Sequence, residues 1–190
     1  KTIFDAYILE GTGGTYSFDL GLRYVDQVAS EGYTTDEKAI NKIEPNGMYI
    51  LYHSGGYDDG YVYANGTENC KWGVSYEDGG KIDPNYVWRF EKLEGQEDQY
   101  ALASMGSSGY YIKSVGISSA QIPLTNDNAT LNHFLTVGKS GNKLTFKTVS
   151  TAWTGAAYYL NNSGSNEVWA KTTAATYILY KVTKQGGSSS

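Results

Sequence analysis

The sequence has a single cysteine, Cys70, and two histidines, His53 and His133. One cysteine cannot form a disulfide within the chain, and so few nitrogen and sulfur ligands argue against a structural zinc site. Asp-rich turns could supply oxygen ligands to calcium, but no EF-hand spacing is present. We therefore expect neither a metal nor a cofactor. The low cysteine content does not exclude export.

Basic residues and long apolar runs are also scarce. The chain has a net charge of -5 and only two arginines, Arg23 and Arg89. A surface that binds phosphates has to be basic, so this composition argues against a nucleic-acid partner. No apolar run approaches the roughly 18 residues that span a bilayer, so we expect no membrane-spanning segment. The first residues lack the apolar core of a signal peptide, and we expect a mature fragment or a piece of a longer chain.

Tyrosine and glycine, in contrast, are abundant, with 18 and 23 residues, which favours a turn-rich β domain. A short tyrosine strand occurs three times, as Gly60-Tyr61-Val62-Tyr63, Gly109-Tyr110-Tyr111-Ile112 and Ala157-Tyr158-Tyr159-Leu160. From Tyr61 to Tyr110 is 49 positions and from Tyr110 to Tyr158 is 48. This near-constant spacing indicates an internal repeat.

Each repeat contains four short strands separated by turns. The repeats run from Gly47 to Gly95, from Gln99 to Gly141 and from Asn142 to Lys184. Their aromatic and β-branched runs, bounded by Gly, Asn, Asp and Ser, are typical of strands in an all-β domain. One repeat cannot bury its own apolar face, so three must share a core, and closure removes the sheet edges. Twelve strands in three lobes predict a β-trefoil over residues 47–184.

The flanking segments do not belong to the repeat. Residues 1–46 predict a short α/β extension, in which Thr34 and Glu37 form a capping box and Pro45 ends a helix. This extension is either a connector left from a preceding domain or an integral elaboration of the module. Residues 185–190 have the composition of a flexible tail.

Catalytic constellations are lacking. His53 and His133 lie in different repeats, and no G-x-S-x-G motif occurs. The acidic residues of the first repeat, such as Asp58, Asp59 and Asp83, could lie near one another. A glycosidase, however, needs two carboxyl groups facing each other across a cleft, and a trefoil has no deep cleft. We therefore expect no catalytic residue and no enzymatic activity.

Aromatic residues in turns give a more productive signal. Sugar C–H faces pack on aromatic rings, and sugar hydroxyls need amide or carboxylate partners. Trp169 is a further aromatic residue of the third repeat, whereas the second repeat has no tryptophan. Many of the other aromatic residues are needed for core packing. The candidate ligand-binding residues are Tyr57, Asp58, Asp59, Trp72, Trp153, Asn161 and Asn162.

The repeat pattern resembles the ricin-B-like β-trefoil superfamily. The opening strand, Tyr49-Ile50-Leu51-Tyr52, is most similar to Tyr-rich trefoil modules found beside catalytic domains in secreted bacterial polysaccharide-degrading enzymes. Ricin-type sites carry an aspartate in the strand after the first turn and close each repeat with Gln-x-Trp. Here Tyr63, Ile112 and Leu160 align with the aspartate, and Val87-Trp88-Arg89-Phe90 lacks the glutamine. The resemblance therefore does not support galactose binding by the ricin geometry.

The resemblance implies a non-catalytic carbohydrate-binding module of a secreted or surface bacterial glycan-processing protein. Its partner would be a glycan or polysaccharide, it would be exported to the periplasm or cell surface, and it would be covalently linked to further domains. Binding would raise the effective concentration of an attached enzyme at its polymer. The alternatives are a protein-binding trefoil, such as a protease inhibitor or adhesion module acting through the loop Ser75 to Tyr86, and a structural spacer.

Overall fold

The computed structural model describes residues 32–54, 59–116, 121–127, 133–148, 158–162 and 166–185. The chain divides into two compact units, Lys1–Glu31 and Gly32–Ser190, and all described residues belong to the second. The elements expected within residues 1–31 and the tail beyond Gln185 lie outside the described residues.

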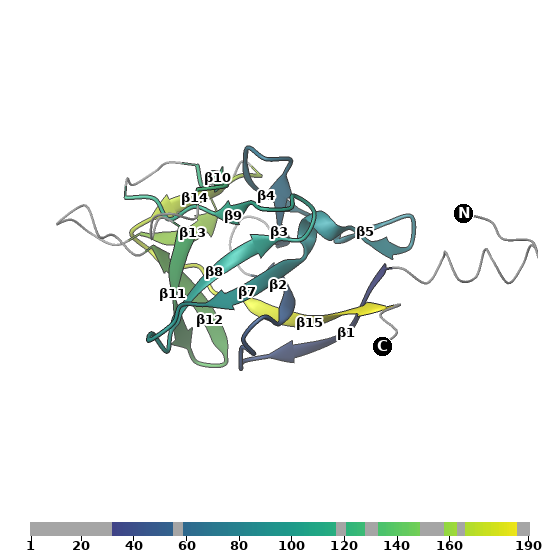
Figure 1. The fold of residues 1–190 in the computed structure, drawn as a ribbon, viewed down its shortest axis with the longest axis horizontal. Helices are drawn as coiled ribbons and strands as arrows, with labels where there is room; N and C mark the ends of the chain where they lie inside the picture. Colours follow the sequence, from purple (N-terminus) through teal and green to yellow (C-terminus); the bar gives the residue numbers. More distant parts are fainter. Residues whose placement is uncertain are drawn as a thin grey trace, which may run out of the picture. The chain divides into compact units, whose positions relative to one another are not determined.

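The twelve predicted strands are present, four in each lobe (Figure 1). Lobe one consists of β2 (Met48–His53), β3 (Gly60–Asn65), β4 (Asn69–Gly73) and β7 (Trp88–Lys92). Lobe two consists of β8 (Gln99–Ser104), β9 (Tyr111–Ile112), β10 (Leu124–Thr125) and β11 (Phe134–Ser140). Lobe three consists of β12 (Lys143–Thr148), β13 (Tyr159–Asn162), β14 (Val168–Lys171) and β15 (Ile178–Gln185).

The first and fourth strands of each lobe form a closed antiparallel barrel. Neighbouring strands follow the order β15-β2-β7-β8-β11-β12. Two backbone hydrogen bonds between Leu144 and Tyr177, of 2.9 and 2.8 Å, join β12 back to the start of β15. This closure removes open strand edges from the ring of paired strands, as the repeat predicts.

The second and third strands of each lobe form hairpins that cap the barrel. The hairpins are joined by single antiparallel bridges: Asn69–Pro123, Gln121–Trp169 and Lys71–Glu167. Because side chains alternate along each strand, residues one position away face inward. The inward residues Cys70, Ile122 and Val168 are fully buried. The bridged residues are therefore left on the outer surface of the cap.

Two aromatic side chains, Trp88 at the start of β7 and Tyr177 directly before β15, connect the barrel to this cap. The indole Nε1 of Trp88 donates to the carbonyl of Val62 at 3.0 Å, and the hydroxyl of Tyr177 donates to the carbonyl of Leu160 at 3.0 Å. Both donors are fully buried and satisfied. Trp88, which is all that remains of the closing motif of the repeat, is thus a core residue.

The observed strand pairing moves the sequence-based alignment of the tyrosine repeat by one residue in lobes two and three. The first-strand residues Tyr52, Ala103 and Lys147 pair with Tyr61, Tyr111 and Tyr159, respectively. The equivalent tyrosines are therefore 61, 111 and 159, rather than 61, 110 and 158. The next residue inward in each lobe, Val62, Ile112 or Leu160, is fully buried. A slip of one residue exchanges the two faces of a strand, so this correction changes which side chains face solvent.

The helix predicted around residues 34–43 is wrong. Gly32–Ile40 is instead a strand, β1, which pairs antiparallel with β15 from Gly32–Gln185 to Ile40–Leu179 (Figure 1). The register is irregular between Thr35 and Ala39, where Glu37 has a φ of 54°. Pairing along the free side of β15 overrides the local capping signal. The sheet therefore begins before Gly47.

The long loop of lobe one is a small hairpin packed on the barrel. It contains β5 (Glu77–Asp78), β6 (Lys81–Ile82) and the 3-10 turn η1 (Pro84–Tyr86). Tyr76 and Ile82 are buried in a second apolar cluster with Ile50 and Val182. The base of this hairpin is therefore fixed, and its tip at Asp78 is exposed.

Burial of tyrosines predicts a loss of stability at alkaline pH. Burial raises the pKa of Tyr86 to about 12 and raises the pKa of Tyr61, Tyr100 and Tyr177 above their usual value. Above about pH 10 the unfolded chain releases these protons while the folded chain keeps them, so stability falls as pH rises from about 10 to 12. Urea unfolding at successive pH values should show a constant free energy of unfolding up to about pH 9 and a decline beyond pH 10. Tyrosines that all ionise together near pH 10 in folded protein would contradict this.

Candidate functional site

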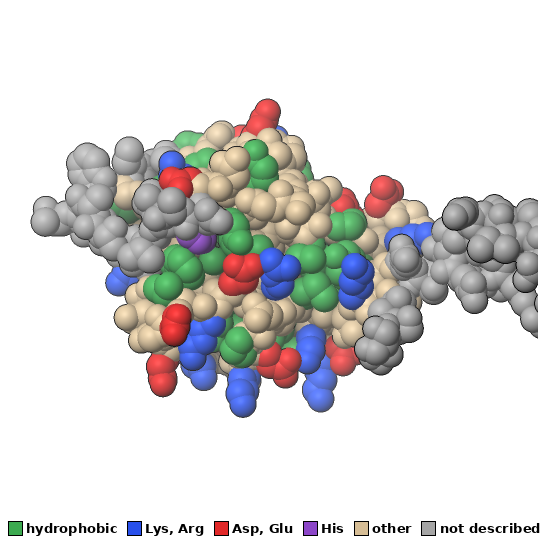
Figure 2. Space-filling model, viewed as in Figure 1, with side chains coloured by type: hydrophobic (Ala, Val, Ile, Leu, Met, Phe, Trp, Pro, Cys, Tyr) green, Lys and Arg blue, Asp and Glu red, His purple; other side chains and the backbone are tan. Residues whose placement is uncertain are grey.

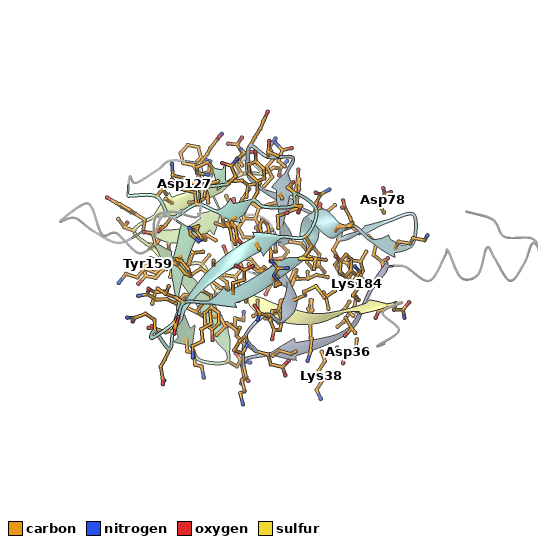
Figure 3. The ribbon with its side chains drawn as sticks, viewed as in Figure 1. Asp36, Lys38, Asp78, Asp127, Tyr159 and Lys184 are labelled. Carbon is orange, nitrogen blue, oxygen red and sulfur yellow. The ribbon has the colours of Figure 1, made fainter. Side chains whose placement is uncertain are left out.

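The outer face of the β13–β14 hairpin in lobe three gathers aromatic, amide and charged side chains. Tyr159 pairs with Lys171, and Asn161 pairs with Trp169. Directly opposite residues of a strand pair share a face, so these four side chains lie on one surface. All four are half-buried, whereas Leu160 between them is fully buried. Tyr159, labelled in Figure 3, lies on the side of the molecule formed by β11 to β13.

Trp169 lies at the centre of this surface, between two amides. Asn161 is its neighbour on β13, and Gln121 is its neighbour across the bridge to lobe two. The carboxylate oxygen Oε2 of Glu167 accepts from Gln121 Nε2 at 2.5 Å and from the indole Nε1 of Trp169 at 3.3 Å. Two donors thus fix the position of the Glu167 carboxylate beside the ring.

The Asn161 side chain is also held in place. Its Nδ2 donates to the carbonyl of Thr173 at 2.8 Å, and its Oδ1 accepts from the backbone N–H of Asn162 at 2.7 Å. A ring, an amide and a carboxylate with fixed orientations are preorganised for a ligand with an apolar face and several hydroxyls. A sugar has both features.

Only lobe three combines a ring with an amide at these positions. Val62–Trp72, Ile112–Leu124 and Leu160–Ala170 are equivalent strand pairs. The position of Trp169 is therefore occupied by Lys71 in lobe one and Pro123 in lobe two. The position of Asn161, which the corrected register aligns with Tyr63, is occupied by Lys113 in lobe two. Lobes one and two consequently lack the pairing seen in lobe three.

Trp72, one of the predicted ligand-binding residues, faces the interior of the cap. It is 5% exposed, stacks on Tyr177 with an interplanar angle of 7°, and donates from Nε1 to the carbonyl of Glu167 at 3.1 Å. The alternation of β4 directs Lys71 outward and Trp72 inward. No face of this indole is open to a sugar, so we remove Trp72 from the candidate site.

The remaining predicted ligand-binding residues do not all lie on one surface in the described residues. Asn161 belongs to the lobe-three surface, and Asn162 follows it on β13, half-buried and paired with Val168. Asp59 is exposed directly before β3 in lobe one. Tyr57, Asp58 and Trp153 lie outside the described residues.

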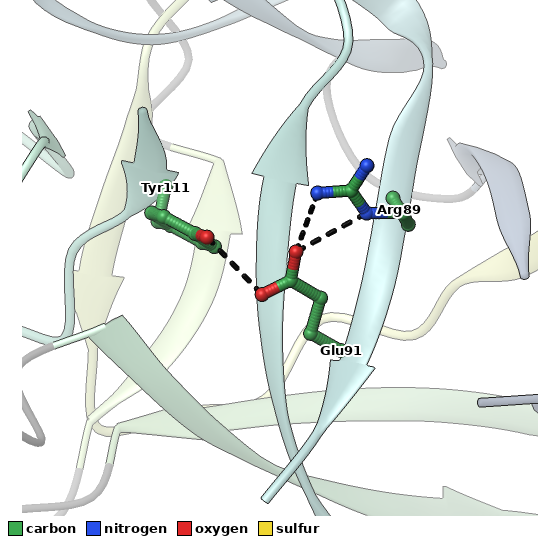
Figure 4. A network of polar contacts seen from close by, with 3 residues as sticks. All are labelled: Arg89, Glu91 and Tyr111. Carbon is green, nitrogen blue, oxygen red and sulfur yellow. Dashed lines mark hydrogen bonds and ion pairs between the residues drawn. The ribbon is translucent and has the colours of Figure 1, made fainter. Parts of the chain in front are cut away.

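The repeated tyrosine of the second strand has different surroundings in lobes one and two. In lobe two the Tyr111 hydroxyl donates to Glu91 Oε2 at 3.1 Å, while Arg89 donates to Glu91 Oε1 at 2.5 and 3.1 Å (Figure 4). In lobe one Tyr61 packs against Tyr52 and Tyr76, with centroid distances of 4.9 and 5.0 Å. The Tyr111 hydroxyl of lobe two therefore bonds to a carboxylate of β7 in lobe one, whereas Tyr61 is surrounded by packed rings.

The cysteine and both histidines, which are described by the structure, are buried. Burial raises the pKa of the Cys70 thiol, which disfavours the reactive thiolate. His53 is bonded through Nδ1 to the carbonyl of Thr176 at 2.7 Å and lies beside Trp72. His133 is buried beside Tyr111 and Phe134.

Other kinds of site are not found in the described residues. Within these ranges no group of three or more His, Cys, Asp and Glu side chains is placed to hold a metal ion. Helices long and apolar enough to cross a bilayer are likewise not found there. On the face drawn in Figure 2, acidic and basic side chains are interspersed rather than gathered into one basic field.

Comparison with known proteins identifies the fold. No family model and no curated protein sequence matches the chain. Among solved structures, a mosquitocidal holotoxin matches with a TM-score of 0.57 and 13% identity, over 76% of this chain and 18% of the toxin chain. The Polyporus squamosus lectin bound to Neu5Aca2-6Galb1-4GlcNAc matches with a TM-score of 0.50 and 17% identity, over 75% of this chain. The match spans half of that lectin, 50% of its chain. These similarities show that the chain has a β-trefoil fold.

Proposed function

We propose that the chain is a non-catalytic carbohydrate-binding module with its site on the outer face of β13–β14. The observation that carries the proposal is the half-buried Trp169 ring, flanked by Asn161 and Gln121 and bonded to Glu167. A sugar ring would stack on the indole, and its hydroxyls would bond the neighbouring amide and carboxylate groups. The similarity of the fold to a sugar-bound lectin is consistent with this function.

The chemistry of this surface favours binding over catalysis. Glu167 is the only carboxylate among the side chains that surround Trp169 in the described residues. Hydrolysis of a glycosidic bond ordinarily uses two carboxyl groups that flank the bond. Two donors also hold the Glu167 carboxylate in place through Oε2. An ionised carboxylate has further acceptor sites, which could accept hydrogen bonds from sugar hydroxyls.

The wider setting that we propose is a bacterial glycan-processing protein, secreted or displayed at the cell surface. In that setting the module holds an attached enzyme at its polymer, which raises the effective concentration of substrate. The tyrosine-rich opening strand of lobe one, Tyr49 to Tyr52, supports this part of the proposal.

A glycan-array screen of the full chain tests the proposed function. Retention of a chemically related set of glycans is the expected result. A folded chain that binds nothing on a broad array would overturn the proposal and favour a protein partner.

A protein-binding role has one specific observation in its favour. Val74, at the base of the β5–β6 hairpin, is 92% exposed. A protein partner could contact this side chain together with the exposed hairpin tip at Asp78. Because the base of the hairpin is packed through Tyr76 and Ile82, it presents a fixed surface rather than an extended inhibitory loop.

A further inference from the structure

Two lysines flank the repeated tyrosine of lobe three. Lys147 of β12 pairs with Tyr159 of β13, which in turn pairs with Lys171 of β14. These three residues therefore form a row across three adjacent strands on the face that carries Trp169. The Lys147 Nζ lies 5.9 Å from the centroid of the Tyr159 ring. We call these three residues the basic row.

The other two lobes provide an internal comparison for the basic row. The equivalent rows are Tyr52–Tyr61–Gly73 in lobe one and Ala103–Tyr111–Thr125 in lobe two. The central tyrosine is constant, but lysines flank it only in lobe three. The trefoil scaffold therefore does not require them, and they occur in the lobe that also carries Trp169 and Asn161 on its outer face.

Within the part of the chain that the structure describes, no ion pair neutralises the lysines of the basic row. The ion pairs of the described residues are Arg89–Glu91 and Lys181–Glu44, and neither involves Lys147 or Lys171. Glu167 precedes Trp169 along the chain, whereas Lys171 follows it, so the carboxylate lies on the far side of the ring from the basic row. A local positive field on a chain with a net charge of -5 is available to an anionic ligand.

The basic row is within reach of a glycan bound on Trp169. It lies two residues along the strands from the Asn161–Trp169 pair, which corresponds to about 7 Å. This separation is comparable to the length of one sugar residue. A group carried by the sugar next to the one on the indole would therefore lie over Tyr159, between the two lysines.

We propose that lobe three selects anionic glycans, in which a carboxylate or sulfate group lies over the basic row while a neighbouring sugar stacks on Trp169. This inference rests on the proposed carbohydrate-binding function and names the class of its ligand. Each half-exposed lysine contributes a modest, salt-sensitive attraction, so removal of one should weaken binding of an anionic glycan about 3- to 5-fold at low salt.

The test compares neutral, uronic-acid and sulfated oligosaccharides of equal length for binding to the full chain by calorimetry. The variants are Lys147→Gln, Lys171→Gln and the double variant, with Lys92→Gln, at the exposed end of β7, as the charge-matched control. Wild type and control should bind the anionic oligosaccharides about 10-fold more tightly than the neutral one at an ionic strength of about 0.01 M, where the screening length is about 30 Å. The double variant should lose this preference and keep the affinity for the neutral oligosaccharide.

The outcomes separate the two claims. Equal affinity for neutral and anionic oligosaccharides, or an anionic preference that survives in the double variant, overturns this inference and leaves the binding function intact. Failure to bind any oligosaccharide overturns both. Preference for only one of the two anions supports the inference and identifies the group that the lysines recognise.

Discussion

Replacement of Trp169 by alanine should weaken glycan binding about 30-fold or more, because aromatic anchors at the centre of a binding site are commonly worth 2–4 kcal/mol. The substitution removes the stacking surface and one of the two donors that fix the Glu167 carboxylate. Trp169 is half-buried on the outer face of β14 and is not part of the main core, so the variant should remain folded. Calorimetric titration with a glycan that wild type binds measures the change.

Two matched variants control this experiment. Trp169→Phe keeps an aromatic face but loses the indole N–H, so its affinity should lie between those of wild type and Trp169→Ala. Lys92→Ala removes an exposed side chain at the end of β7, outside this hairpin, and should leave binding unchanged. Equal affinities of wild type and folded Trp169→Ala would show that the site is not on this hairpin.

Replacement of Trp88 by alanine should have the largest effect on stability. The Trp88 side chain is fully buried, and its Nε1 satisfies the carbonyl of Val62 in the cap. Loss of a buried tryptophan costs about 3–5 kcal/mol through lost burial and the cavity that remains. For a domain of this size this cost corresponds to a fall in melting temperature of roughly 6–20 °C.

Trp88→Phe separates packing from hydrogen bonding at this position. The ring still fills most of the cavity, but the carbonyl of Val62 loses its indole donor, so the cost should be about 1–3 kcal/mol. Urea unfolding monitored by circular dichroism measures both variants. A cost below about 1 kcal/mol for Trp88→Ala would contradict the role of this side chain as the link between barrel and cap.

The sequence was sufficient to predict the fold because the repeat reports on long-range structure. Each repeated strand packs in the same way in its own lobe, so the regular spacing of the tyrosines indicates three similar lobes. It could not settle the register in lobes two and three, where two tyrosines are adjacent, as in Tyr110-Tyr111 and Tyr158-Tyr159. Either tyrosine of such a pair can face solvent, and only the pairing with the first strand decides between them.

The N-terminal strand was missed for a related reason. Thr34 and Glu37 have the spacing of a helix cap, which is a local signal. The partner of this segment, β15, is about 150 positions away in the sequence, from Gly32–Gln185 onward. Pairing with an otherwise open strand edge outweighs a cap worth about 1 kcal/mol.

The candidate site was predicted only in part. The sequence predicts Asn161, which lies on the lobe-three surface, but it predicts Trp72 in place of Trp169. Their neighbours could have distinguished the two tryptophans. In Cys70-Lys71-Trp72 the alternation places the lysine outward and the tryptophan inward, whereas in Val168-Trp169-Ala170 small apolar residues flank an outward tryptophan.

Glu167 and Gln121 could not have been found in this way. They come from different lobes and meet only because the three hairpins close into a cap. Their contact depends on how the lobes are placed relative to one another. The local sequence pattern of either strand contains no information on that placement.

The most direct test of the lobe-three site is a nitrogen–proton correlation spectrum of the indole groups during titration with a glycan selected on the array. The chain has four tryptophans, Trp72, Trp88, Trp153 and Trp169, so each indole N–H can be assigned by single substitution to phenylalanine. If the glycan stacks on β14, the Trp169 signal should shift with saturation while the signal of buried Trp88, which bonds to Val62, stays in place. A shift confined to Trp153, or no shift of Trp169 when the chain is saturated, would contradict the proposed site.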